Sequence, residues 1–278
     1  MQWLRSSMVQ GRGRLGLVIV GSCILGVSVT CADVAMEQIA TWGFPIGEEL
    51  GYQVKWGAIP VGEVTVTTGW VEDAEGALLQ LRSRVRSNRA IAMLYPVSID
   101  MESVVQVDSF LPVRHTLISR EGRRRKHEEM QFDYDKGEAL LHAVLRGRKE
   151  TVKLEHETRD LFTFLYYVRR YPMELGSKTH HRVLTDDKIY DLWLEVAEAE
   201  QRVSTILNER VSAVSVEPEA AFEGVFRRQG RLEIHVSRDP RQLMLQMRAN
   251  VPIGSVWVEL VEVRGPGADR WGRLDTEE

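Results

Sequence analysis

The stretch FPIGEELGYQVKWGAIPVGEVTV, residues 44–66 of a chain of 278 residues, has the pattern of β-strands. Its apolar and polar side chains alternate, as in strands that bury one face. Tyr52 and Trp56 fall on one face of a first strand, and Val64 belongs to a second strand after a turn at residues 58–62. Glycines interrupt the alternation at Gly47, Gly51, Gly57 and Gly62. Because glycine permits bulges and close strand crossings, we interpret the stretch as a bent β-hairpin.

Two of these glycines also match part of a phosphate-binding loop. Gly57 and Gly62 have the G-x-x-x-x-G spacing, but Glu63 and Val64 follow where such a loop needs Lys and Ser or Thr. A carboxylate repels phosphate, and Pro60 lacks a backbone N–H donor. We therefore expect no bound nucleotide.

Alternating segments continue along the rest of the chain. They are expected at residues 78–86, 96–107, 113–120, 128–134, 139–145, 150–156, 190–196, 211–216, 232–236, 243–247 and 256–260. Short turns containing Gly or Asp separate several of them. The pattern predicts a mainly β protein, an antiparallel meander that forms a curved sheet, a half-barrel or a barrel-like sandwich.

One segment, RDLFTFLYYVRRYP at residues 159–172, breaks the alternation. Its apolar residues recur at helical spacing, at Leu161, Phe164, Leu165 and Val168. Asp160 or Thr158 is suited to cap the start of a helix, and Pro172 prevents its continuation. We predict one amphipathic helix at about 159–171, inside a single β-rich domain of residues 33–263, with a flexible tail at 264–278.

Residues 1–32 have the composition of a secretory signal peptide. Three arginines precede an uncharged run at 15–29, which is shorter than the roughly 20 residues of a spanning helix. We expect a periplasmic protein after cleavage near Ala32. The alternatives are an uncleaved N-terminal membrane anchor and a lipoprotein modified at Cys23.

Cleavage would change both the cysteine count and the charge. Cys23 and Cys31 lie in the segment to be removed, so the mature chain would have no disulfide and no thiolate metal site. Removing Arg5, Arg12 and Arg14 from 36 basic residues leaves 33 against 40 acidic ones, a net charge of −7. This balance argues against nucleic acid as a partner.

Residues with metal or catalytic chemistry show no known spacing. His180 and His181 are adjacent, so on a strand they point to opposite faces, and Asp186 and Asp187 are typical of a hairpin turn. The mature chain has no G-x-S-x-G, S-x-x-K or H-E-x-x-H motif. We therefore predict no metal, no cofactor and no catalytic residue.

A basic cluster, Arg123 to Lys126, stands in the segment SREGRRRKHEE. It could contact anionic lipid headgroups or an acidic partner. Glu128 and Glu129 follow closely and no aromatic residue is interleaved, so a solvated hairpin tip is the main interpretation.

Three stretches resemble the bacterial envelope family of unknown function DUF3108. Residues 44–64 carry its opening pattern, here Phe44, Gly47-Glu48, Leu50, Tyr52, Trp56-Gly57 and Val61-Gly62. Residues 159–176 carry its Asp-led helix, here Asp160, Tyr166, Tyr167 and Arg169. Residues 230–260 keep Ser237 and Asp239, but have His235 and Leu243 where Trp and Pro are usual. The resemblance implies an exported, β-rich protein without recognised catalytic residues.

Three classes of function follow from these patterns. The first is a non-catalytic envelope protein that binds a lipid or another amphipathic ligand on an inner strand face formed by Tyr52, Trp56, Trp70, Leu79 and Leu81. A packed core is the alternative interpretation of that face. The second is a structural or assembly factor that binds another envelope protein. The third, least favoured, is a glycan- or lipid-acting enzyme using Asp186, Asp187 or Asp239.

Overall fold

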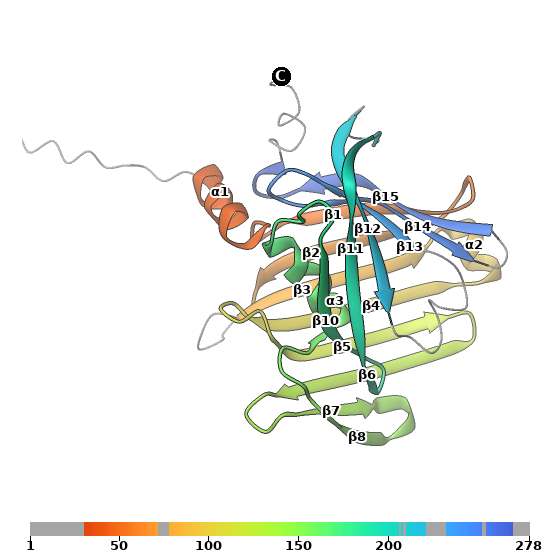
Figure 1. Cartoon of the computed structure of the whole chain (residues 1–278). Coiled ribbons are helices and arrows are strands. Elements are labelled where there is room, and N and C mark those ends of the chain that lie inside the picture. The colour runs from red at the N-terminus through yellow and green to blue at the C-terminus, as the bar shows by residue number, and fades with distance from the viewer. Residues whose placement is uncertain are drawn as a thin grey trace, which may run out of the picture.

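The computed structural model describes residues 31–71, 78–205, 207, 210–220, 232–251 and 254–268. Residues 1–30 of the predicted signal peptide and residues 269–278 of the predicted tail lie outside this part of the chain. Within it, fifteen strands form one continuous curved sheet (Figure 1). The predicted mainly β, curved antiparallel architecture is thereby confirmed.

The sheet consists of two antiparallel meanders. The first contains β1 (Glu49–Trp56), β2 (Ile59–Trp70), β3 (Leu78–Ser87), β4 (Val97–Gln106), β5 (Pro112–Glu121), β6 (Arg124–Asp133), β7 (Glu138–Ala143) and β8 (Arg148–Lys153). The second contains β10 (Lys178–Thr185), β11 (Lys188–Val203), β12 (Val211–Ala220), β13 (Leu232–Ser237), β14 (Met244–Val251) and β15 (Gly254–Arg264). β1 pairs with β15 and joins the two meanders.

Short elements connect and flank the meanders. β9 (Arg159–Asp160) pairs in parallel with β10 at one edge of the sheet. The helices are α1 (Cys31–Trp42), α2 (Arg89–Leu94) and α3 (Leu161–Tyr167), and the 3₁₀ turns are η1 (Val144–Arg146) and η2 (Val168–Arg170). No described helix has the length and apolar content needed to cross a membrane.

Helix α3 lies between the two halves of the curved sheet, which cross in front of and behind it (Figure 1). Phe164 packs into a cluster of β10–β13 side chains, whereas Phe162 and Tyr166 pack with residues of β3 and β4. The helix is therefore buried on two sides. Asp160, one of the two residues that the sequence offers as a cap, caps its start by accepting a hydrogen bond from the Thr163 amide at 2.9 Å.

Two glycines of the first hairpin allow the backbone geometry of the turn and the close approach of β2 to β3. Gly57 has a φ of 58° in the β1–β2 turn, in the left-handed region that favours glycine. Gly62 lies opposite a register shift between Val54 and Lys55, and a Cβ there would be 2.5 Å from the Arg86 carbonyl oxygen. The strand crossing is too close for a side chain, which confirms the interpretation of a bent hairpin.

Ion pairs cover the outward face of β3–β5. Glu102 accepts from Arg82 and Arg114 at 3.1 Å each, and Asp100 pairs with Arg84 and Arg86. Opposite charges across adjacent strands stabilise a sheet modestly. These arginines are thus neutralised within the protein.

Several elements of the structure are not predicted from the sequence, α1, α2 and β10 among them. α1 crosses the expected cleavage junction, α2 precedes β4, and β10 contains both His180 and His181. The observed α-helix is shorter than the predicted one. α3 ends at Tyr167, and the 3₁₀ turn η2 follows it to Arg170. Pro172 follows, consistent with its role in ending the helix.

Candidate ligand-binding site

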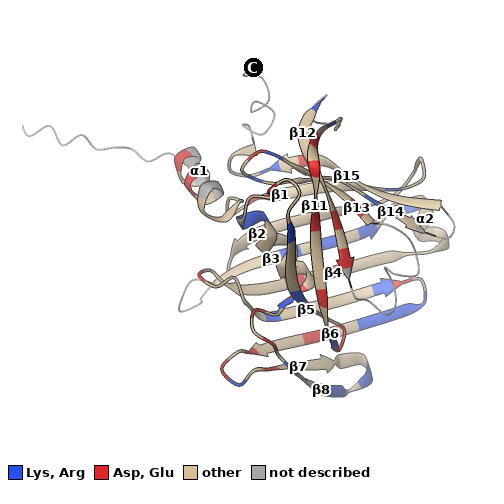
Figure 2. Ribbon diagram, viewed as in Figure 1, with Lys and Arg blue, Asp and Glu red and all other residues tan. Residues whose placement is uncertain are grey.

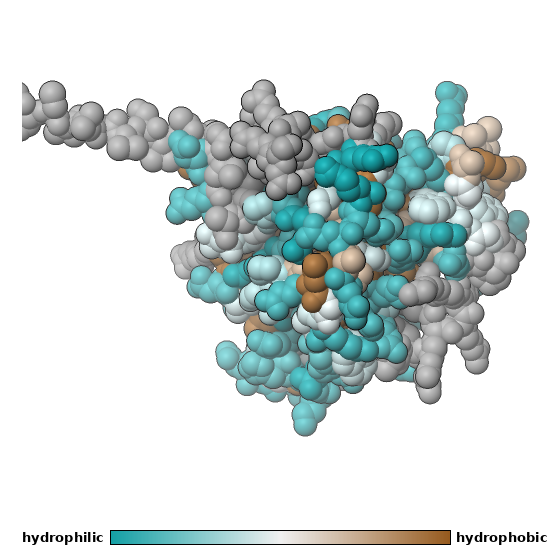
Figure 3. Space-filling view, turned by 45° about the horizontal axis from the view of Figure 1, so that its top comes forward, coloured by the Kyte–Doolittle hydropathy of each residue, from teal (hydrophilic) through white to brown (hydrophobic). Residues whose placement is uncertain are grey.

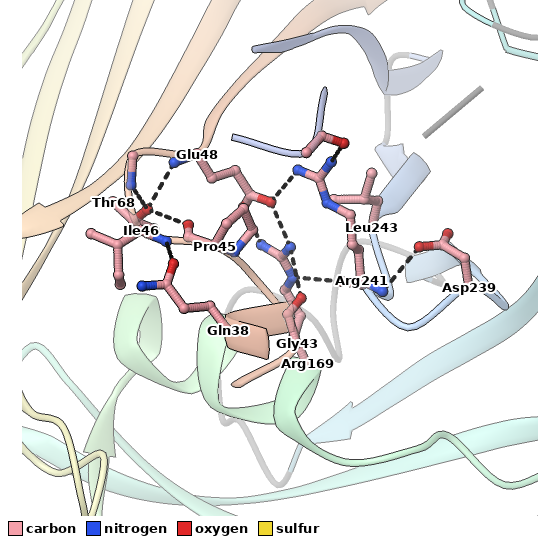
Figure 4. Close-up of polar contacts among 12 residues, drawn as sticks. Gln38, Gly43, Pro45, Ile46, Glu48, Thr68, Arg169, Asp239, Arg241 and Leu243 are labelled. Atoms are coloured by element: carbon pink, nitrogen blue, oxygen red, sulfur yellow. Dashed lines mark hydrogen bonds and ion pairs between the residues drawn. The ribbon is translucent and has the colours of Figure 1, made fainter. Parts of the chain in front are cut away.

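A buried ion cluster joins three segments that are far apart in the sequence (Figure 4). Glu48, fully buried at the start of β1, accepts hydrogen bonds from Arg169 at 2.7 and 3.0 Å. Arg241, in the β13–β14 connection, donates to the same carboxylate at 2.6 Å. Arg169 also donates to the carbonyl oxygens of Arg241 and Gly43. One carboxylate therefore holds the end of the mid-chain helix and both sheet halves.

The electrostatics of Glu48 favour its charged form. Burial alone would raise the pKa of the carboxyl, but the guanidinium groups of Arg169 and Arg241 outweigh it and hold that pKa below its usual value. The cluster is thus an ionised, hydrogen-bonded unit in the protein interior. Removing one partner of such a unit leaves an uncompensated buried charge.

The cluster and its neighbours fix the chain that follows α3. Gln242 donates through Nε2 to the carbonyl oxygens of Arg169 and Tyr171, and its Oε1 accepts from the Met173 amide. Arg238 donates to the Met173 carbonyl at 2.6 Å. Side chains of the β13–β14 connection therefore hold residues 169–173, of which 171–173 follow the end of η2.

A cavity of about 310 Å³ lies beside this fixed segment, between η2 and the inward face of β10 and β11. Most of its lining is apolar or aromatic: Tyr167, Val168, Tyr171, Pro172, Met173, Ser177, Thr179, His181, Leu194 and Val196. Its volume is at the lower end of the range for small-molecule sites, roughly 300–1,000 Å³. The arrangement suits the apolar part of a small molecule.

Few polar groups line the cavity, and Arg159 lies behind its wall rather than in it. Arg159 lies over the ring of the lining residue Tyr167 at 3.5 Å and donates to the carbonyl oxygens of Phe110 and Glu157. His181 Nε2 lies 3.0 Å from Thr179 Oγ1. Burial, together with the charges of Arg159 and His180, lowers the pKa of His181 to about 4. The His181 side chain, which lines the cavity, is therefore neutral near pH 7.

A second polar cluster lies at the start of α3. The buried Asp160 carboxylate accepts from the Ser103 hydroxyl at 2.9 Å, the Thr163 hydroxyl at 2.5 Å and the Thr163 amide. His115 Nδ1 lies 2.8 Å from Ser103 Oγ and 3.3 Å from Asp160 Oδ1. A catalytic relay needs the two different histidine nitrogens to face serine and aspartate, and here one nitrogen faces both. We interpret this cluster as a helix cap.

A smaller cavity of about 130 Å³ adjoins this cap. Leu161 and Leu165, both about half exposed, contribute to its lining, as do Lys126 and Glu128. Leu161, Leu165 and Val168 lie on one side of the helical segment, because they are four and three residues apart. That side thus contributes to both cavities.

The five residues predicted to bind ligand are divided between two environments. Tyr52 is buried in a core cluster with residues of β11, β12, β14 and β15, and Leu79 and Leu81 are buried in the cluster that contains Phe162 and Tyr166 of α3. Trp56 and Trp70 are 46% and 48% exposed. None of the five lines the cavity beside η2. Their role in binding stays a prediction.

The other candidate side chains lie on turns and outer faces. Asp186, in the β10–β11 turn, pairs with Lys126 of β6. Asp239 accepts a hydrogen bond from the Arg241 amide at 2.9 Å. His180 contacts Asp191 at 2.7 Å on the outer face, whereas His181 faces inward. The two histidines thus point apart, as predicted. No group of three or more potential metal ligands occurs among the described residues.

Sequence comparison decides the family. A family model described as a protein of unknown function, DUF3108, matches residues 51–261. The chain belongs to the DUF3108 family. The buried polar residues Asp160, Arg169 and Arg241 of this DUF3108 chain lie inside the matched region, and Glu48 lies three residues before its start. No curated protein matches the sequence.

One solved structure supports the fold of this DUF3108 chain, and two others match it more weakly. A β-barrel-like protein of the domain of unknown function DUF1849 from Brucella abortus has 10% identity and a TM-score of 0.52, over 78% of this chain and 97% of that one. A candidate exported protein with a YmcC-like fold from Bacteroides fragilis has 7% identity and a TM-score of 0.34, over 79% and 96%. A candidate lipoprotein from Parabacteroides distasonis has 8% identity and a TM-score of 0.33, over 81% and 99%. The first of these supports a barrel-like fold.

Proposed function

We propose that this DUF3108 protein is an exported, non-catalytic envelope protein that holds the apolar part of a lipid or similar amphipathic molecule in the cavity beside η2. The observation that carries the proposal is the aromatic and aliphatic lining of that cavity, with polar groups at Ser177, Thr179 and His181. Such a lining favours an apolar body with one polar end. Export to the periplasm, with cleavage near Ala32, belongs to the same proposal and rests on the sequence of residues 1–32.

Two further features support an elongated apolar ligand. Leu161 and Leu165 leave apolar surface exposed on the side of α3 that continues to Val168 at the cavity. The segment at 169–173 is held in place before any ligand arrives, through Gln242 and Arg238. A preformed wall lowers the cost of ordering the site on binding.

A fluorescence titration with cis-parinaric acid, a fatty acid that fluoresces in apolar surroundings, tests the proposal. We expect saturable binding at one site. Thr179→Trp should weaken it by about tenfold or more, 1.4 kcal/mol or above, because the indole fills the cavity. Lys178→Trp is the matched control, since Lys178 is the adjacent exposed residue of β10 and does not line the cavity.

The outcomes separate the classes of function. Equal binding by both variants, or no saturable binding by the unaltered chain, would contradict a ligand site here. A stoichiometric envelope protein recovered with a clean, ligand-free chain would instead favour the assembly factor.

A further inference from the structure

Apolar side chains project from one end of the sheet, where α2 and the β1–β2 turn lie. Met93 and Leu94 are 79% and 87% exposed, and Tyr95 and Ile59 also expose more than half of their surface. No residue of α2 is buried. Hydrophobic colour gathers at the upper right of Figure 3, the side on which α2 lies in Figure 1. We call Ile59, Met93, Leu94 and Tyr95 the apolar tip.

The apolar tip is held firmly despite its exposure. Asn88 caps α2 by accepting from the Ile91 amide at 2.9 Å, and its Nδ2 donates to the Pro60 carbonyl at 2.6 Å. The Tyr95 ring lies against Gly122, where a Cβ would be 2.5 Å from the ring, and the Gly122 amide donates to the Pro96 carbonyl. The tip is therefore fixed to both the β1–β2 turn and the β5–β6 turn.

Arginines without acidic partners surround the apolar tip. Arg89 begins α2, and Arg120, Arg123, Arg124 and Arg125 lie at the β5–β6 turn beside Tyr95; all five are exposed. Arg120 and Arg125 are directly opposite each other across the two strands, an arrangement of like charges that destabilises a sheet. Figure 2 shows this basic end of β5 and β6 on the same side as α2.

The arginines elsewhere on the outward face of β3–β5 form ion pairs, unlike those around the tip. Arg82, Arg84, Arg86 and Arg114 each pair with Glu102 or Asp100. Among the residues that the structure describes, no ion pair involves any of the five arginines around the tip, although the exposed Glu121 ends β5 directly opposite Arg124. Five arginines and one glutamate therefore leave a net positive charge beside the apolar tip.

We infer that this end of the sheet docks on the surface of an anionic lipid bilayer, with Met93 and Leu94 entering the interfacial region and the five arginines contacting lipid phosphates. Exposed apolar side chains with a basic rim are the combination that binds such surfaces, because burial and headgroup attraction act together. Guanidinium groups bind phosphate oxygens in a paired geometry. The inference goes beyond the proposed cavity and does not depend on it.

The test places an environment-sensitive NBD fluorophore at the tip. The full chain, with Cys23→Ser and Cys31→Ser, carries Leu94→Cys for labelling, and a matched chain carries Asp108→Cys in the β4–β5 turn at the other end of β4. Vesicles of phosphatidylglycerol and phosphatidylethanolamine are added to each, and vesicles of phosphatidylcholine serve as the neutral comparison. The NBD emission reports the polarity around position 94 itself, so membrane binding by the N-terminal segment alone does not change it.

We expect the emission at position 94 to shift to the blue and increase several-fold with the anionic vesicles, and to change little with the neutral ones or at position 108. Arg120→Gln with Arg125→Gln should raise the half-saturating anionic lipid concentration about fivefold or more, and added salt should weaken binding. The double substitution Arg82→Gln with Arg84→Gln, on the same outward face, should change the half-saturating anionic lipid concentration less than about twofold.

Three results would overturn the inference. One is a probe at position 94 that stays in water at saturating anionic lipid. Another is an equal change at position 108. The third is a blue shift produced by an envelope protein fraction but not by lipid alone, which would make the tip a protein-binding surface.

Discussion

Arg169 donates hydrogen bonds to both carboxylate oxygens of Glu48, at 2.7 and 3.0 Å, and so ties the end of the mid-chain helix to the start of the first strand. Arg241 adds the connection between β13 and β14 to the same carboxylate. Because Gln242 follows Arg241 and holds residues 169–173, the ion cluster also supports the wall of the cavity.

Glu48→Gln should lower the free energy of unfolding by about 3–5 kcal/mol, because two buried guanidinium groups lose their counter-charge. Urea denaturation measures this change. Glu49→Gln is the control: Glu49 is the partly exposed neighbour that pairs with Arg264, and its loss should cost about 1 kcal/mol or less. Equal effects of the two substitutions would contradict a structural role for the cluster.

Acid should remove the contribution of Glu48. Its pKa is lower in the folded chain than its usual value of 4.5, so the stabilisation is present above pH 4.5 and is lost as the pH falls through the lowered folded pKa. Urea denaturation of the unaltered chain and of Glu48→Gln from pH 7 to pH 2 should show two curves that converge below pH 4.5. A difference that is constant over this range would show that the charge is irrelevant.

Asp160→Ala should cost about 2–4 kcal/mol, because it removes the helix cap and leaves the buried amide and hydroxyl of Thr163 without their acceptor. Thermal unfolding followed by circular dichroism checks the loss. Asp187→Ala, at the exposed β10–β11 turn, should change stability by less than about 0.5 kcal/mol. A small effect at Asp160 would refute its assignment as a buried cap.

His181 should titrate with a midpoint of about 4, well below the usual 6.5, because it is partly buried near Arg159 and His180, with Glu157 acting in the opposite direction. Imidazole ¹⁵N chemical shifts followed by NMR give the midpoint. Since the folded pKa is lowered, stability from neutral His181 is complete above pH 6.5 and falls as the pH decreases from 6.5 to about 4. A midpoint near 6.5 would mean that the cavity wall is solvated.

Gln242→Ala should loosen the cavity wall. The Met173 amide donates to Gln242 Oε1, so its hydrogen exchange should accelerate by about tenfold or more in the variant, equivalent to 1.4 kcal/mol or above of local opening. Exchange mass spectrometry of the peptide that contains residues 169–173 measures the change. Gln246→Ala, whose amide reaches Ser204 instead, should leave that peptide unaffected.

Much of the sheet could be predicted from the sequence, because side chains with a period of two report one-sided burial. β10 lacks that signal, because its adjacent residues Val183 and Leu184 are both buried. Val183 packs in the cluster around Phe164 of α3, and Leu184 packs against residues of β6 and β7. A strand that is covered on both faces does not alternate between apolar and polar side chains. α2 did offer a local signal, since Asn88 is a preferred helix cap.

The site is harder to predict, since its parts meet only in the folded chain. Glu48 and Arg169 are 121 residues apart, and Glu48 and Arg241 are 193 apart. Glu48 and Arg169 do stand within the stretches that resemble DUF3108, but no local spacing indicates that they pair. The cavity likewise combines residues 167–173 with β10 and β11, and no single segment reports it.

A ligand in the cavity beside η2 can be sought by native mass spectrometry of the chain purified from its own envelope, followed by solvent extraction and identification of bound molecules. We expect a reproducible amphipathic molecule on the unaltered chain and on Lys178→Trp, and its loss from a folded Thr179→Trp. A ligand-free mass for the unaltered chain, or the same molecule on all three, would contradict a ligand site beside η2.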